Sequence, residues 1–436
     1  MNFLQMLSKI KEREIKAVIF SFLFVVVLMS AYYILRPVRD AMASDWTDAE
    51  VSWLWTLNFF ISTGIVALYG IAVSKFRFRL LVPTMYGIFA GSFVMFYLLG
   101  SISDDRTLID KAFYVWVSVF SLFNISVFWS FMSELFSKEQ SGRLFGIIAV
   151  GASIGGLIGP SITAFFSVSL GIDNLMLIAS TMLLIPIPII FYLQSLKATD
   201  LNNGKLDLTP PSQPICGNPI AGFKMLFSNP YLLSIALFIF LYTGISSFIY
   251  FELKNLLSDL SRPERSAIWA QMDLAVNILS ISIGLFATGR IVGRFGMPIT
   301  IALVPVMVFV GLIILAISPL LGVVMVLQII RRAGNYGMTR PAREMLFTLV
   351  DRETRFKAKP VIAIVAYRGS DMLMAWLFTG LTQGLGLGLT MERSGQRHKF
   401  KEGIHFVNTV IVMDTVLMLP VRQLVQVLQV ALMLTL

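Results

Sequence analysis

The feature that most constrains this chain is a pair of segments that each occur twice, about half a chain length apart. Residues 70–77 (GIAVSKFR) match residues 289–296 (GRIVGRFG), and residues 135–140 (LFSKEQ) match residues 349–354 (LVDRET). Each segment is a basic turn between two apolar stretches that are long enough to cross a membrane. The repetition predicts a duplicated bundle of transmembrane helices packed about a pseudo-twofold axis.

The composition is typical of a membrane protein. Of the 436 residues, 56% are hydrophobic and only 14% are charged. A helix needs about 20 apolar residues to cross the hydrocarbon core of a bilayer. We predict eleven spans and a weaker twelfth, near residues 16–35, 51–73, 80–100, 112–133, 143–168, 173–195, 231–251, 267–289, 297–317, 319–338, 361–388 and 404–434.

The net charge of +10 is explained by membrane topology rather than by nucleic-acid binding. The basic residues occupy short loops, and far more of them lie on the side that holds the N-terminus. Because cytoplasmic loops are enriched in Lys and Arg, we expect a cytoplasmic N-terminus. The first span lacks a cleavage site and is expected to be retained. The lone Cys216 cannot form an intrachain disulfide.

The longest polar break predicts how the chain is divided. Residues 196–229 contain Asn-Asn-Gly and Pro-Pro sequences, which cannot continue a helix. We therefore expect an N-terminal six-helix half at 1–195, a cytoplasmic linker at 196–229 and a C-terminal half holding helices 7–11 at 230–390. An atypical tail with a weak helix 12 follows at 391–436. This plan is typical of secondary transporters, which bind substrate between the halves.

The fifth predicted span is rich in glycine. Gly151, Gly155 and Gly159 recur at spacings of four, and small residues at this spacing let another helix approach closely. Together with Gly146 and Pro160 the series also resembles a motif of major-facilitator antiporters. Close packing alone explains the glycines equally well, so both interpretations stay open.

Two charges lie within the eleventh span. A charge near the bilayer centre costs about 2.5 to 3.5 kcal/mol on insertion scales, so each one needs a partner or a function. Arg368 and Asp371 are three residues apart and therefore share one helical face. They form either a self-neutralising structural pair or a site in which Asp371 orients Arg368 toward an anionic substrate.

The sequence Arg36-Pro37-Val38-Arg39-Asp40 closes the first span. Proline bends a helix, which can direct both guanidinium groups inward, and the arginine fork suits bidentate contact with phosphate or carboxylate. The alternative is an interfacial stop signal with snorkelling side chains. We take Arg36, Arg39 and Arg368 as candidate substrate-binding residues.

Other charges are candidates for charge balance, proton coupling or gating. Glu134 ends the fourth span and Asp273 lies within the eighth, and each is either a coupling group or a structural partner of an arginine. The charge-balancing candidates are Asp40, Glu134, Asp273 and Asp371. A basic cluster follows the tenth span, and its members Arg340, Arg343 and Glu344 are candidates for a cytoplasmic gate.

The sequence carries no pattern of soluble-type catalysis. His398 and His405 are late and unaccompanied, so a metal site is not expected. No Walker sequence or glycine-rich strand-to-helix turn occurs, which argues against ATP hydrolysis. We expect a protein that is not an enzyme and needs no cofactor.

Residues 32–40 (YYILRPVRD) resemble the ATP/ADP translocase family of nucleotide exchangers and its bacterial relatives, within the major facilitator superfamily. Further blocks share this resemblance, at residues 128–136, 143–146, 340–344, 357–359 and 367–371. The resemblance implies a twelve-helix major-facilitator fold in a bacterial inner membrane. It also implies exchange of nucleotides or similar anions, with transport roles for Arg39, Glu134, Asp273 and Arg368.

The chain departs from the family in several places. Arg39 stands where the exchangers tend to carry lysine, and Ala363 stands where an acidic residue is expected. After residue 390 the tail is basic on the side that should be poor in positive charge. The tail is therefore either divergent or the product of an altered coding frame.

These patterns predict a secondary transporter that works by alternating access and exchanges nucleotides of the ATP/ADP type or a related organic anion. Its partners would be an anionic small molecule and the lipid bilayer, with no nucleic acid. One alternative is a proton-coupled carrier of a different substrate, with Glu134 or Asp273 titrating. The other is a membrane-embedded enzyme or a non-transporting membrane subunit.

Overall fold

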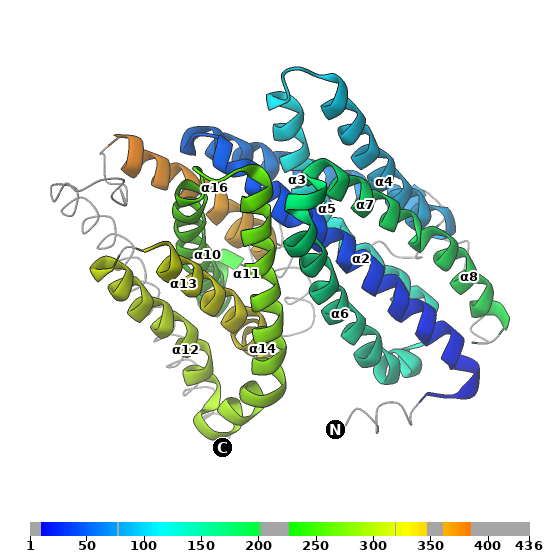
Figure 1. The fold of residues 1–436 in the computed structure, drawn as a ribbon. Helices are drawn as coiled ribbons and strands as arrows, with labels where there is room; N and C mark the ends of the chain where they lie inside the picture. Colours follow the sequence, from blue (N-terminus) through cyan, green and yellow to red (C-terminus); the bar gives the residue numbers. More distant parts are fainter. Residues whose placement is uncertain are drawn as a thin grey trace. The chain divides into compact units, whose positions relative to one another are not determined.

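A computed structural model describes residues 10–75, 78–199, 201, 226–318, 320–346 and 361–384. Helices account for nearly all of these residues, and no strand occurs within them. The predicted all-α class is therefore confirmed for the described chain (Figure 1).

The first six predicted spans are helical. In chain order the elements are η1 (Glu12–Glu14), α2 (Ile15–Met42), η2 (Ala43–Asp45), α3 (Asp48–Lys75), α4 (Phe78–Ile102), α5 (Thr107–Leu135), α6 (Lys138–Leu170), α7 (Ile172–Leu184) and α8 (Pro186–Thr199). The sixth predicted span is divided between α7 and α8, because Pro186 has no amide hydrogen with which to continue the helical ladder.

The described residues of predicted spans seven to eleven are also almost entirely helical. The elements are α10 (Pro230–Leu256), α11 (Arg262–Ser282), η3 (Ile283–Thr288), α12 (Gly289–Ile317), α13 (Leu321–Gly334), η4 (Asn335–Thr339), α14 (Arg340–Leu346), η6 (Ala363–Arg368), α16 (Gly369–Thr379) and η7 (Gly380–Gly384). Of these, η3, η4, η6 and η7 are π-helical. The predicted twelfth span lies outside the described residues, as do Cys216, His398 and His405.

The repeated segment at 289–296 contains the turn that the sequence predicts. Gly296 has a φ of 76°, a left-handed conformation that glycine adopts without steric cost, and it breaks the helical path between α11 and the apolar part of α12. The matching positions 76–77 of the other copy lie outside the described residues, as do residues 349–354 of the second repeated segment.

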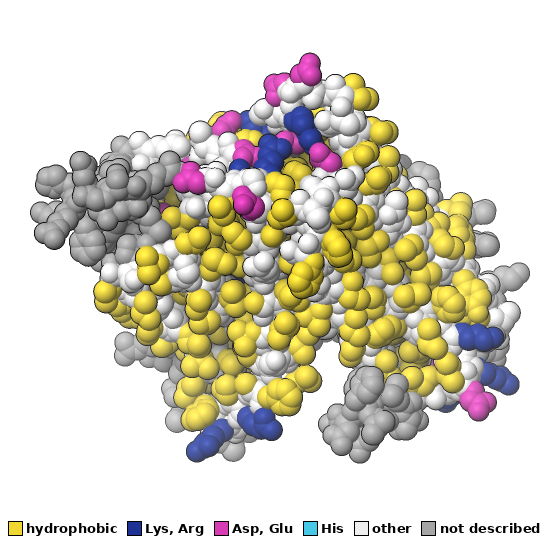
Figure 2. Space-filling view, viewed as in Figure 1, with side chains coloured by type: hydrophobic (Ala, Val, Ile, Leu, Met, Phe, Trp, Pro, Cys, Tyr) yellow, Lys and Arg dark blue, Asp and Glu magenta, His cyan; other side chains and the backbone are white. Residues whose placement is uncertain are grey.

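The surface of the described helices suits a lipid environment. Seven helical stretches of the described chain are long and apolar enough to cross a membrane. In the view of Figure 2, hydrophobic side chains dominate the face, and charged ones gather toward its edges. Large exposed apolar residues include Phe60, Leu98, Phe165, Leu285, Phe286 and Ile314. In water such a surface would drive aggregation, whereas lipid tails solvate it.

The chain forms two compact units. Unit 1 comprises residues 1–45, 60–214 and 260–274, and unit 2 comprises residues 46–59, 215–259 and 275–436. The start of α3 is therefore grouped with the helices of the predicted C-terminal half, and the start of α11 with those of the predicted N-terminal half. The division of the chain at 196–229 stays a prediction.

In unit 1, α2 packs most extensively against α6 (Figure 1). Gly155 faces the backbone oxygen of Val26, and Gly159 faces that of Ser30, so closely that a Cβ atom at either glycine would overlap the α2 backbone. The glycine spacing of the fifth span therefore serves close packing.

Unit 2 is built around α10, which packs against α16 and α13. Gly244 of α10 lies against Met374, and Ser370 donates a 2.6 Å hydrogen bond to the backbone oxygen of Phe240. Small and polar residues thus bring these helices together, since lipid offers no hydrophobic drive for their association.

We expect Gly155→Ala to destabilise the protein by about 1 to 3 kcal/mol, because the added methyl group would overlap the backbone of α2. Gly91→Ala is the matched control, since a Cβ atom there meets nothing within 4 Å. The midpoint of thermal unfolding in detergent should fall for Gly155→Ala and stay level or rise for Gly91→Ala. Equal midpoints for the two variants would contradict the packing described for α2 and α6.

Candidate functional site

Three predicted site residues lie together at the end of α2, on the last turns around Pro37. Asp40 is only 3% exposed. Arg39 donates from Nε and Nη2 to Oδ1 of Asp40 at 2.9 and 2.6 Å. Nε of Arg36, one turn earlier on the same face, lies 3.8 Å from Oδ2 of Asp40. One buried carboxylate therefore holds two guanidinium groups.

Asp273 of α11 joins this group. Its Oδ1 lies 3.8 Å from Nη1 of Arg36, and the residue is 2% exposed. We call Arg36, Arg39, Asp40 and Asp273 the α2 cluster. Two arginines and two aspartates balance one another formally, which a low-dielectric interior requires of buried charges.

Arg39 is positioned by a second helix as well. Its Nη1 donates to Oγ of Ser118 on α5 at 3.2 Å, and its guanidinium carbon lies 5.4 Å from the centre of the Tyr114 ring. The side chains of Arg36 and Arg39 remain 16% and 15% exposed, whereas that of Asp40 is 4% exposed. The accessible part of the cluster is therefore cationic, which suits an anion.

Arginines in the first turn of α11 bind other residues of unit 1, although from the sequence alone they look like ordinary loop charges. Arg262 lies 2.5 Å from Asp45 and 2.7 Å from the buried Asp110. Arg265 lies 2.8 Å from Asp45 and donates to the backbone oxygen of Ala41 at 3.0 Å. These contacts hold the first turn of α11 close to the end of α2, and with it the helix that carries Asp273.

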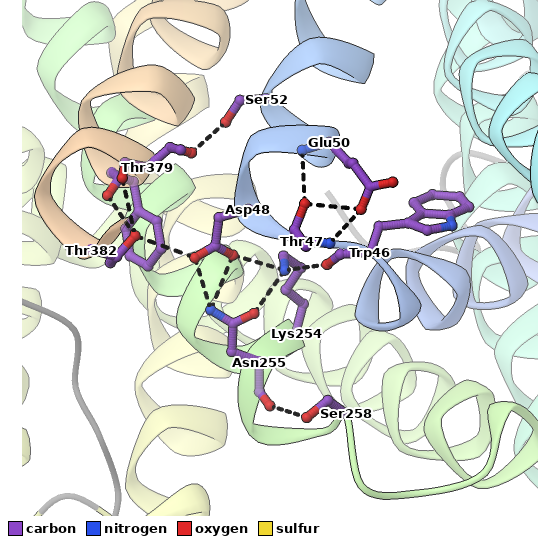
Figure 3. A network of polar contacts seen from close by, with 11 residues as sticks. Trp46, Thr47, Asp48, Glu50, Ser52, Lys254, Asn255, Ser258, Thr379 and Thr382 are labelled. Atoms are coloured by element: carbon purple, nitrogen blue, oxygen red, sulfur yellow. Dashed lines mark hydrogen bonds and ion pairs between the residues drawn. The ribbon is translucent and has the colours of Figure 1, made fainter. Parts of the chain in front are cut away.

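Figure 3 shows a polar network in unit 2 that the sequence analysis also missed. Lys254, in the last turn of α10, is 1% exposed and lies 2.8 Å from Asp48 in the first turn of α3. It also donates to the backbone oxygen of Trp46 and to Asn255, at 3.0 and 2.7 Å. Asn255 and Thr382 donate to Asp48 in turn. Asp48 therefore joins α3, α10 and η7.

The contacts continue along α3. Ser52 and Thr379 share a 2.8 Å hydrogen bond (Figure 3), and Trp376 donates from Nε1 to Oγ1 of Thr56 at 2.9 Å. The start of α3 is thus bonded to both α10 and α16. A sequence signal existed, because Asp45 and Asp48 precede the second predicted span and Lys254 follows the seventh. Both sets lie on the same predicted side of the membrane.

The remaining balancing and binding candidates belong to other elements. Oε1 of Glu134 is 3.2 Å from Nζ of Lys197, and the Glu134 side chain is 43% exposed. Arg368 and Asp371 belong to unit 2, at the end of η6 and in the first turn of α16. Asp371 accepts a 3.4 Å hydrogen bond from Ser247 of α10.

The three predicted gate residues lie on α14. Arg340 is exposed, Glu344 is partly exposed, and Arg343 is buried with its guanidinium carbon 5.3 Å from the centre of the Tyr367 ring. Within the described residues, no group of three His, Cys, Asp or Glu side chains could hold a metal ion.

The comparison with family models decides the class. The model described as Major Facilitator Superfamily matches residues 19–354, which is most of the chain. The chain belongs to the major facilitator superfamily. Its described residues include seven helical stretches long and apolar enough to cross a membrane, as this family requires.

Curated relatives within the superfamily are distant. The chain is 25% identical to ADP,ATP carrier protein 1 of Chlamydia muridarum (strain MoPn / Nigg), over 348 residues that cover 69% of the chain and 64% of the relative. The chain is also 24% identical to ADP,ATP carrier protein 1 of Chlamydia pneumoniae, over 315 residues that cover 62% of the chain and 60% of the relative. The chain therefore spans less than two thirds of the length of these relatives.

Solved structures share the superfamily fold. A POT family transporter in complex with 5-aminolevulinic acid superimposes with a TM-score of 0.63 at 12% identity, covering 94% of this chain and 96% of that one. The nucleoside transporter NupG superimposes with a TM-score of 0.59 at 13% identity, covering 94% of this chain and 100% of that one. At these identities the likeness concerns the fold alone.

We expect Asp48→Asn to lower the free energy of unfolding by about 3 to 5 kcal/mol, because Lys254 would remain buried without its counter-charge. Adding Lys254→Gln should restore much of the loss. Asp173→Asn is the control, since it breaks a pair with Arg106 in which the aspartate side chain is 40% exposed. That variant should cost less than about 1 kcal/mol. Chemical denaturation in detergent micelles measures the free energy of unfolding of these three variants. Equal losses of this free energy for Asp48→Asn and Asp173→Asn would contradict this account.

Proposed function

We propose that this major-facilitator transporter exchanges nucleotides of the ATP/ADP type, or a closely related organic anion, by alternating access. The similarity to the chlamydial ADP,ATP carrier proteins supports this proposal. So does the resemblance of residues 32–40, which include two arginines of the α2 cluster.

The observation that carries the proposal is the pair of partly exposed guanidinium groups, Arg36 and Arg39, above the buried Asp40. A multiply charged anion that enters a low-dielectric site loses its hydration and needs fixed cations in exchange. Arginine forks supply charge and bidentate hydrogen bonds to phosphate. In this proposal Arg36 and Arg39 bind the anion, while Asp40 and Asp273 balance the arginines when no anion is bound.

Exchange is the mode that fits these charges. One anion can replace another on the same guanidinium groups. The site can therefore open to either side of the membrane in turn while a bound anion neutralises its cations. Arg368 is proposed as a further substrate contact, oriented by Asp371, and Glu134 as a balancing charge. Arg340, Arg343 and Glu344 are proposed to form and break contacts at a cytoplasmic gate.

We propose that the transporter lies in a bacterial inner membrane with its N-terminus in the cytoplasm. The excess of Lys and Arg in the loops on that side of the membrane supports this orientation.

A proton-coupled carrier of a different anion is the second candidate. The observation that favours it is Asp273, a buried carboxylate whose Oδ1 lies 3.8 Å from Nη1 of Arg36. In this candidate a proton carried by Asp273 would weaken its contact with Arg36, and uptake would then follow a pH gradient.

The deciding experiment measures uptake of labelled ATP into proteoliposomes that hold the purified protein. Liposomes preloaded with ADP should take up ATP, and empty liposomes should not. Uptake that ignores internal ADP and follows an imposed pH gradient would favour the proton-coupled candidate. Absence of uptake by folded protein would contradict nucleotide exchange.

We expect Arg39→Lys to raise the KM for ATP by about tenfold or more, because lysine keeps the charge beside Asp40 but loses the bidentate fork and the bond to Ser118. The retained charge should leave the midpoint of thermal unfolding nearly unchanged. Arg13→Gln, at an exposed position in η1, is the control and should transport as the wild type does. A fall in the amount of folded protein that parallels the loss of uptake would instead assign Arg39 a structural role.

A further inference from the structure

We propose that Arg331 and Gln328 of α13 form a second oxyanion-binding site, in unit 2, that takes a phosphoryl group of the transported anion. The choice of a phosphoryl group rests on the proposed function. The presence of an oxyanion site follows from the charges themselves.

Arg331 is buried among neutral partners. It is 4% exposed, and its Nε and Nη2 donate to Oε1 of Gln328 at 3.0 and 2.7 Å. Its guanidinium carbon lies 5.9 Å from the centre of the Tyr242 ring, and the Tyr242 hydroxyl donates to the backbone oxygen of Arg331 at 2.9 Å. Within the described residues, no carboxylate lies within ion-pair distance of Arg331.

The surroundings of Arg331 add further positive charge. Arg332 is its neighbour in sequence and is also buried, and Tyr242 interacts electrostatically with both Arg331 and the buried Arg343. Burying a guanidinium group is strongly unfavourable unless an anion compensates it. Lys254 meets this requirement with Asp48, and Arg39 meets it with Asp40. An oxyanion would meet it for Arg331.

Arg331 and Gln328 both carry side-chain N–H groups that can donate to such an anion. Gln328 uses its Oε1 to accept from Arg331, and it is itself 3% exposed. Besides these two bonds, the Arg331 side chain also forms a hydrogen bond with the Tyr242 side chain, which is neutral. A bound phosphoryl oxygen would accept hydrogen bonds from such donors and would add the negative charge that the neutral partners of Arg331 lack.

The backbone around these residues is held firmly. The π-helical segment η4 begins directly after α13, and π-helical turns occur frequently at functional sites. Thr288 donates to the backbone oxygen of Gly337 in η4 at 2.6 Å, and a Cβ atom at Gly337 would lie 2.9 Å from the backbone oxygen of Ser280. The α13–η4 junction therefore presents Arg331 from a fixed position.

The test measures the midpoint of thermal unfolding of the full-length protein in detergent as pyrophosphate is added, with adenosine as a ligand lacking phosphoryl groups. Pyrophosphate should raise the midpoint of the wild type, and adenosine should not. Arg331→Gln removes an uncompensated buried charge, so it should raise the midpoint of the anion-free protein. It should also increase the half-saturating pyrophosphate concentration by about tenfold or more.

Two further variants sharpen the result. Gln328→Glu places a carboxylate beside Arg331, so it should likewise stabilise the anion-free protein and weaken its response to pyrophosphate. Arg294→Gln is the matched control, because Arg294 also stacks on an aromatic ring, that of Phe295, but at an exposed position. Arg294→Gln should change neither the midpoint of the anion-free protein nor the half-saturating pyrophosphate concentration.

A structural role for Arg331 predicts the opposite pattern. The proposal is overturned if Arg331→Gln lowers the midpoint of the anion-free protein and keeps the wild-type response, or if the wild type does not respond. An equal Arg331-dependent response to citrate would overturn the assignment to phosphoryl groups. The proteoliposome assay of nucleotide exchange can fail while the Arg331-dependent response persists, so the two proposals fail separately.

Discussion

The cost of burying charge in a low-dielectric interior is the constraint on which this structure depends. Its buried cations lie where helices meet, and each contact fixes helices relative to one another. Asp40 holds Arg36 and Arg39 at the end of α2, and Arg36 reaches Asp273 of α11. In unit 2, Asp48 pairs with the buried Lys254 and joins α3, α10 and η7. Because the hydrophobic effect does not favour helix association in lipid, such contacts carry much of the specificity of packing.

The same contacts link packing to transport. The helices α3 and α11 each contribute residues to both compact units, and the first turn of each is held by ion pairs. A rearrangement that separates these helix ends must therefore break buried pairs or supply other partners for their charges. Substrate anions can supply such partners to arginines such as Arg36 and Arg39. On this account, binding energy and conformational change act on the same set of side chains.

The sequence carried the fold and part of the site. Apolar length predicted helices where the described residues of the first eleven predicted spans are helical, and the glycines of the fifth span predicted a close approach by another helix, which is α2. The cost of a membrane charge singled out Arg36, Arg39, Asp40 and Asp273, which the structure brings together. The networks around Lys254 and Arg262 escaped prediction, because a charge near a span end looks like an ordinary loop residue until its partner is located. The lack of a carboxylate beside Arg331 among the described residues escaped for the same reason, since only packing reveals which buried charges have such a partner.

The central claim is that the arginines exchange anions of different charge, and the current that accompanies transport tests it most directly. ATP carries one more negative charge than ADP, so one-for-one exchange moves net charge across the membrane. Proteoliposomes loaded with ADP should give a transient current when ATP is added outside, and its sign should reverse when the two nucleotides trade sides. ATP uptake without current, or a current that follows only the pH gradient, would contradict the account.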